Sequence, residues 1–176
     1  MSEQPRACRD DEFGAILSII NQAAQAYRGV IPADCWHEPY MSAAALRREI
    51  EAGVKVRVLE SDGQRAGVMG TQAVRNVDLI RHAYVLPAFQ GRGAGGALIG
   101  EIIAARTRPI LVGAWAAAAW AIGFYRRHGF EQTSEASKTM LLETYWTISP
   151  RQIETSVVLA FPPLGDVQAG ALTTKA

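Results

Sequence analysis

The sequence has little of several features that mark specialised proteins. Its 176 residues include two cysteines, Cys8 and Cys35, which are too few for a disulfide scaffold and lack the spacing of a metal site or redox pair. Lysine and arginine number 18 against 17 aspartates and glutamates, so a net charge near +1 gives no basic field for a polyanion. We therefore expect two reduced thiols, no metal site and no nucleic-acid partner.

Long hydrophobic runs are also missing. A helix that spans a bilayer needs about 18 consecutive apolar residues, and the longest candidate, residues 110–120, falls short. Residues 1–6 do not combine a cationic start with an apolar core, as a signal peptide would. These observations predict a cytoplasmic protein without a membrane segment.

What the sequence does have is the composition of a globular protein, with 49% hydrophobic and 20% charged residues. A chain of this length can bury about two thirds of its unfolded surface in one core. We expect one domain over residues 1–161. Residues 161–165, FPPLG, are expected to end regular structure, and the small and polar residues 162–176 are expected to form a flexible tail.

Patterns of apolar residues predict the order of helices and strands. Asp10 and Ser42 are suited to cap two early helices, and Gly53 is suited to end the second. An antiparallel meander then leads to a helix, and the next strand should run parallel to its predecessor by the right-handed crossover rule. The expected strands cover residues 5–9, 54–60, 66–74, 79–85, 110–115, 130–133 and 152–160, and the later helices cover residues 93–105, 118–128 and 137–146.

A glycine-rich corner joins the central strand to its helix. Residues 90–96, QGRGAGG, follow the strand that ends at Val85 and precede the helical spacing of Leu98 and Ile102. The first N–H groups of a helix lack partners and carry a partial positive charge, and glycine lets an anion approach them closely. The corner therefore predicts a phosphate site.

Residues 91–96 also satisfy the G-x-G-x-x-G spelling of a dinucleotide-binding turn. Such a site needs an acidic residue after the next strand to bind the ribose. Here the strand at residues 110–115 is followed by alanine at positions 116–119, and no acidic residue lies between Glu101 and Glu131. A nicotinamide or flavin site would lack its ribose ligand.

The corner instead resembles the Gln/Arg-x-x-Gly-x-Gly/Ala motif of the GCN5-related N-acetyltransferases (GNAT), with Gln90, Gly93 and Gly95 in register. Residues 121–130, AIGFYRRHGF, are similar to that family's A-x-x-F-Y-x-x-x-G-F segment. The resemblance implies an α/β fold (α+β by some schemes) with a mixed, mostly antiparallel sheet of about seven strands flanked by helices. It also implies a V-shaped split between the fourth and fifth strands. Homodimers are the usual default for such folds, so a homodimer is expected.

The resemblance further implies acetyl-CoA as the cofactor and transfer of its acetyl group to a primary amine, in a small molecule or an exposed amino group, by direct attack in a ternary complex. The pantetheine arm would pair with the main chain of Val85, and the Tyr125 hydroxyl would protonate the departing thiolate. The residues expected to bind the cofactor are Val85, Gln90, Gly91, Arg92, Gly93, Ala94, Gly95, Gly96 and Tyr125.

The general base is the least defined part of the predicted site. An amine with a pKa of about 10.4 must lose a proton, which costs roughly 4 to 5 kcal/mol at neutral pH. Leu79 and Gly113 stand where the family often has glutamate, and Ala118 stands where it often has asparagine. His82 is the candidate base, although strand alternation places Arg81 and His82 on opposite faces unless a bulge intervenes. A structural histidine with an ordered water as relay is the alternative.

The segment between the first two helices is unusually aromatic for a connector. Its rings suit a cation or an amphipathic amine, and the candidate substrate-binding residues are Tyr27, Trp36, His37, Glu38 and Arg81. Residues 134–150 depart from the family pattern and could line the acceptor site or a dimer interface. Because the usual base is missing, a non-catalytic acyl-CoA-binding regulatory module is the alternative function.

Overall fold

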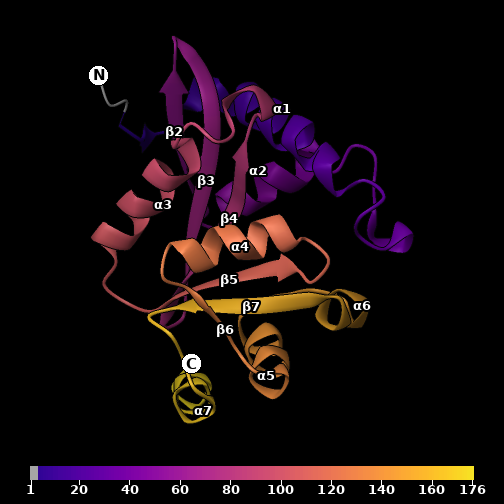
Figure 1. Cartoon of the computed structure of the whole chain (residues 1–176), viewed down its shortest axis with the longest axis vertical. Helices are drawn as coiled ribbons and strands as arrows, with labels where there is room; N and C mark the ends of the chain where they lie inside the picture. Colours follow the sequence, from indigo (N-terminus) through magenta and orange to yellow (C-terminus); the bar gives the residue numbers. More distant parts are fainter. Residues whose placement is uncertain (1–3) are drawn as a thin grey trace. The chain divides into compact units, whose positions relative to one another are not determined.

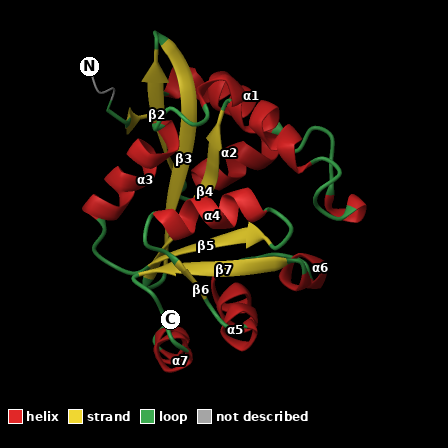
Figure 2. Ribbon diagram, in the orientation of Figure 1, coloured by secondary structure: helices red, strands yellow, loops and turns green. Residues whose placement is uncertain are grey.

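The computed structural model describes residues 4–176, which form two compact units (Figure 1). The first comprises the residues up to Arg28, Trp36–Gln72 and Ile80–Ala105, and the second comprises Gly29–Cys35, Ala73–Leu79 and Arg106–Ala176. The strands are β1 (Arg6–Ala7), β2 (Lys55–Ser61), β3 (Gln64–Val74), β4 (Val77–Val85), β5 (Ile110–Trp115), β6 (Glu131–Gln132) and β7 (Ser156–Phe161). The α-helices are α1 (Phe13–Ala24), α2 (Ala43–Glu51), α3 (Ala94–Ala105), α4 (Ala119–Arg127), α5 (Glu135–Tyr145), α6 (Pro150–Glu154) and α7 (Asp166–Thr174) (Figure 2).

The strands form one seven-stranded sheet in the order β1-β2-β3-β4-β5-β7-β6. β4 and β5 are parallel, with Asp78 opposite Ile110 and Leu79 opposite Leu111. β2 is antiparallel to β1 and β3, and β7 is antiparallel to β5 and β6. The predicted fold class, a mixed sheet of seven strands flanked by helices, is confirmed.

In the first unit, helices cover both faces of β2. Val56 and Val58 point to one face, where they pack with residues of α1 and α2 such as Ile20 and Leu46. Arg57 lies between the two valines and therefore points to the other face, where it forms an ion pair with Glu101 of α3. α3 is thus held over the opposite side of β2 (Figure 1).

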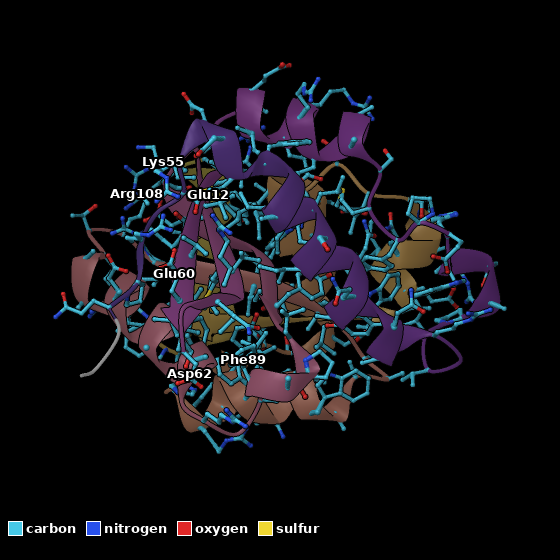
Figure 3. The ribbon with its side chains drawn as sticks, turned by 90° about the horizontal axis from the view of Figure 1, so that it is seen from above. Glu12, Lys55, Glu60, Asp62, Phe89 and Arg108 are labelled. Atoms are coloured by element: carbon cyan, nitrogen blue, oxygen red, sulfur yellow. The ribbon has the colours of Figure 1, made fainter. Side chains whose placement is uncertain are left out.

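A buried carboxylate ties the beginning of α1 to the edge of the sheet. The Glu12 side chain is fully buried and accepts hydrogen bonds from Arg6, from the Arg9 main chain and from Arg65, each at 2.8 Å. Arg6 also contacts Glu60 of β2. Glu12 and Glu60 are labelled in Figure 3. The bonds from Arg6, together with those from Arg9 and Arg65, outweigh the opposing effect of burial and hold the pKa of Glu12 well below its usual range.

The second unit has its own core between the sheet and the helices α5 and α7. Its buried residues are Val77, Leu79, Leu111, Leu141, Leu142, Tyr145, Val158, Ala160 and Ala169. β5 and β7 form one side of this core. They pair along their whole length, from Ile110 with Phe161 to Trp115 with Ser156. None of the described helices is long and apolar enough to cross a bilayer.

The prediction that regular structure ends after residue 161 was wrong, because residues 166–174 form α7. Ala169 is fully buried in the core of the second unit, so the small residues of this segment allow close packing. Asp166 accepts hydrogen bonds from the hydroxyls of Ser134 and Ser137, at 2.5 and 2.6 Å. Asn76 donates to the Leu172 carbonyl at 2.9 Å and fixes the other end of the helix.

Candidate functional site

The glycine corner lies between β4 and α3, as its sequence predicts. A short helical turn, Pro87–Phe89, follows the strand, and Phe89 is buried beneath it. The side-chain amide of Gln90 then donates to the Val85 carbonyl at 3.0 Å. Gln90 thereby ties the corner to the last residue of the central strand.

The backbone of the corner fits an anionic group. Gly91 and Gly93 have φ angles of 74° and 90°, in the region that favours glycine, and a Cβ atom on either would meet nothing within 4 Å. The Ala97 N–H donates to the Gly93 carbonyl at 2.9 Å. Ala97 is therefore the first residue of the helix whose N–H has an intrahelical acceptor, and the N–H groups of residues 94–96 are available to a ligand. This arrangement suits an anionic group such as a phosphate.

Arg92 extends from the same corner. Its side chain is 62% exposed, lies 3.7 Å from the Asp62 carboxylate and has its guanidinium carbon 5.8 Å from the centre of the Phe89 ring. Phe89 and Asp62 lie at the same end of the first unit (Figure 3). Exposed ion pairs of this kind contribute little, so Arg92 can exchange Asp62 for an anionic ligand at small cost.

The two candidate residues on β4 meet at one carboxylate that the sequence did not single out. His82 has a φ of 52°, a left-handed conformation that is typical of a β-bulge. Nε2 of His82 lies 2.5 Å from Oε2 of Glu49, and Nη2 of Arg81 lies 3.1 Å from the same oxygen. The exception attached to the expected alternation therefore applies, because the irregular backbone at His82 lets Arg81 and His82 contact the same carboxylate.

A glycine in the neighbouring strand makes room for the irregular backbone. A Cβ atom on Gly70 of β3 would lie 2.9 Å from the Arg81 carbonyl oxygen and 3.0 Å from Val54. Any side chain at this position would push against the main chain of β4 beside His82. Gly70 therefore helps to hold the bulge in place.

The aromatic residues of the connector converge on the central strand. The Tyr40 ring stacks on Tyr27 with centroids 5.9 Å apart, lies 5.6 Å from Trp36 and meets Tyr84 of β4 edge to face at 6.4 Å. Burial, aided by the neighbouring Tyr40, raises the pKa of Tyr27 to about 12. The side chain of Asn21 holds the Met41 main chain through two hydrogen bonds, of 2.9 and 2.8 Å, which anchors the connector on α1.

The structure brings Tyr27 and Trp36 into one cluster through Tyr40, a residue of the aromatic connector that is not among the predicted substrate-binding residues. His37 and Glu38 instead have exposed side chains in the same connector. Arg81 is engaged with Glu49, so any contact with an acceptor would use its remaining donors. The contacts of these residues with a substrate stay predictions.

The second unit holds the other candidates. Tyr125 of α4 is buried, and its ring lies 5.2 Å from Phe124 and 5.6 Å from Phe130. Ala118 precedes α4 without a side-chain cap, and a Cβ atom on Gly113 of β5 would lie 3.6 Å from the Trp146 ring. Among residues 4–176 no group of three histidine, cysteine, aspartate or glutamate residues is placed to hold a metal ion.

Comparison with known proteins places this architecture in a family. The profile of the acetyltransferase (GNAT) domain matches residues 19–140. No curated protein matches the sequence. The chain belongs to the GNAT acetyltransferases, a family of acyltransferases that use acetyl-CoA. The predicted family and cofactor are thereby confirmed.

Solved structures of low sequence identity share the fold. PaiA N-acetyltransferase from Thermoplasma acidophilum, crystallised with coenzyme A, has a TM-score of 0.67 at 14% identity and covers 91% of this chain and 98% of its own. A GNAT acetyltransferase from Staphylococcus aureus Mu50 has a TM-score of 0.68 at 10% identity, covering 90% and 98%. Ribosomal-protein-alanine N-acetyltransferase from Brucella melitensis has a TM-score of 0.61 at 19% identity, covering 89% and 97%.

Proposed function

We propose that this protein is an N-acetyltransferase that transfers an acetyl group to a primary amine, either in a small molecule or in an exposed amino group. The observation that carries the proposal is the open glycine corner at the beginning of α3, with positive φ angles at Gly91 and Gly93 and free space beside both. Similar structures include PaiA N-acetyltransferase in complex with coenzyme A and a ribosomal-protein-alanine N-acetyltransferase, which supports nitrogen as the acceptor atom.

The corner binds and orients the cofactor. The main-chain N–H groups of residues 91–96 donate to the diphosphate, and Arg92 adds a positive charge. Gln90 holds the Val85 carbonyl, which fixes the end of β4 where the pantetheine arm is expected to pair. When bound, acetyl-CoA supplies a thioester carbonyl that an amine can attack.

Two side chains move the protons of the transfer. The His82 imidazole accepts the proton that the amine loses as the new C–N bond forms. The Tyr125 hydroxyl donates a proton to the sulfur as the C–S bond breaks. Both residues keep the catalytic roles predicted from the sequence, and both roles are proposals.

The acceptor is proposed to lie against the aromatic cluster of Tyr27, Trp36, Tyr40 and Tyr84. Rings of this kind attract a cationic or amphipathic amine through their faces. His37, Glu38 and Arg81 remain candidates for polar contacts with it. A cytoplasmic location and a homodimer also remain predictions.

The proposal is tested by measuring thiol release from acetyl-CoA with a panel of primary amines, including aliphatic amines, aromatic amines and peptides with free N-termini. We expect turnover on at least one class of amine, with the acetylated product identified by mass spectrometry. Tight binding of coenzyme A by calorimetry without turnover on any amine would favour the alternative of a non-catalytic binding module. Leu79, Gly113 and Ala118, which stand where the family often has glutamate or asparagine, motivate that alternative.

A further inference from the structure

Glu49, on α2, makes a contact that the proposed reaction can use. One carboxylate oxygen of Glu49, Oε2, lies 2.5 Å from Nε2 of His82 and 3.1 Å from Nη2 of Arg81. The His82 side chain is 8% exposed, against 26% for Glu49 and 24% for Arg81. The histidine is therefore the most enclosed member of a three-residue cluster that joins α2 to the bulge of β4.

We infer that Glu49 is a positioning residue that fixes the tautomer of His82, with the hydrogen on Nε2 and the lone pair on Nδ1. This inference rests on the proposed function, in which His82 takes the proton of the acceptor amine. An ionised carboxylate can only accept hydrogen bonds, so the ring nitrogen that faces Glu49 must carry the hydrogen. Nδ1 of the neutral ring is then the atom that accepts the proton.

The surroundings of Glu49 keep it ionised. Burial by itself would raise the pKa of the carboxyl group, but the hydrogen bond from His82 and the charges of His82 and Arg81 outweigh burial and lower it. Arg81 therefore has a role of its own in the cluster. Its guanidinium compensates the carboxylate, so that Glu49 stays an acceptor when the ring is neutral.

The backbone conformation of β4 brings the side chains of Arg81 and His82 to the same carboxylate. A left-handed residue other than glycine in the middle of a strand is strained and persists only where its surroundings impose it, and His82 has a φ of 52°. Regular alternation would turn either His82 or Arg81 away from α2. Gly70 of β3, which has no room for a Cβ atom, accommodates the distortion.

The charged groups that face His82 come from two elements. α2 contributes Glu49, and β4 contributes Arg81. β3 presents the uncharged Gly70 behind the bulge, and the neighbouring Tyr84 belongs to the aromatic cluster.

The tautomer is tested in the free protein by nitrogen-15 NMR of the histidine rings, with the His82 signals assigned from a His82→Gln spectrum. We expect the neutral ring of the wild type to carry its hydrogen on Nε2, and Glu49→Gln to give a mixture of the two tautomers. Glu51→Gln is the matched control, because Glu51 is an exposed glutamate on the same helix. A wild-type ring with its hydrogen on Nδ1 overturns the inference.

The same variants are then compared in turnover with the best amine of the panel. Glu49→Gln should lower the plateau of the kcat/KM profile about tenfold or more through the wrong tautomer. Glu51→Gln should leave the profile unchanged. An unchanged profile for Glu49→Gln in an active enzyme overturns the inference and leaves the proposed function standing. Absence of wild-type turnover with the Nε2 tautomer present refutes the proposed function instead.

Discussion

Substitution of Gly93 by valine separates a phosphate site from an ordinary tight turn. Gly93 has a φ of 90°, and a Cβ atom there would meet no protein atom within 4 Å. Valine at this position therefore costs backbone strain of about 1–3 kcal/mol but creates no clash inside the protein. The added side chain instead occupies the space through which an anion reaches the N–H groups of α3.

The loss of binding can be estimated from the contacts at stake. One hydrogen bond to a charged group contributes about 1.5–3 kcal/mol, which corresponds to a rise in the Kd for coenzyme A of roughly 10-fold to 150-fold. We expect Gly93→Val to show a rise in this range by isothermal titration calorimetry. Its Tm should fall by about 2–12 °C, from about 2–4 °C for each kcal/mol of strain in a protein of this size.

Gly53 provides the matched control. It follows α2 with a φ of 102° and also has no atom within 4 Å of a Cβ position, so Gly53→Val carries similar backbone strain away from the corner. We expect it to lower the Tm by a similar amount and to leave the Kd unchanged. Equal coenzyme A affinity in the two variants would refute the assignment of the corner as a phosphate site.

Three further predictions concern the acid, the buried carboxylate and the last helix. Tyr125→Phe should lower kcat about tenfold or more and leave the Kd for coenzyme A intact; unchanged turnover with chemistry rate-limiting would remove the hydroxyl from the mechanism. Glu12→Gln should cost about 3 kcal/mol in chemical denaturation at pH 7. Because the folded pKa of Glu12 is depressed, this difference should shrink as pH falls below 4.5, and a constant difference would contradict the network. Ala169→Arg should destabilise the protein by about 2–3 kcal/mol, whereas an unchanged free energy of unfolding would mean that α7 contributes nothing to the core.

Much of the fold was predictable because apolar spacing and turn residues decide it locally. The strand at residues 110–115 was predicted with its observed bounds, and Ser42 caps α2 through the Ala45 N–H at 3.1 Å. The glycine corner was predictable because its residues are adjacent in sequence, and the role of each follows from its immediate neighbours. α7 was missed because its burial depends on α5 and on Asn76, which lies 96 residues before its partner Leu172.

The irregular parts of the site were not readable in the same way. Period-two alternation describes a regular strand, and the left-handed backbone at His82 breaks it. Glu49 is 33 residues away from His82 and looks like any other glutamate of a surface helix in the sequence. Gly70 was the available signal, because a glycine inside a strand often marks a bulge or a close approach of another chain segment.

The central claim is that the N–H groups of residues 91–96 donate hydrogen bonds to the diphosphate of coenzyme A. The most direct measurement is a titration of the nitrogen-15-labelled protein with coenzyme A, following every backbone amide by NMR. We expect the largest changes in amide chemical shift at residues 91–96. The phosphorus-31 chemical shifts of the coenzyme A diphosphate should change over the same titration. Saturating coenzyme A that leaves these amides unmoved while shifting others would contradict the claim.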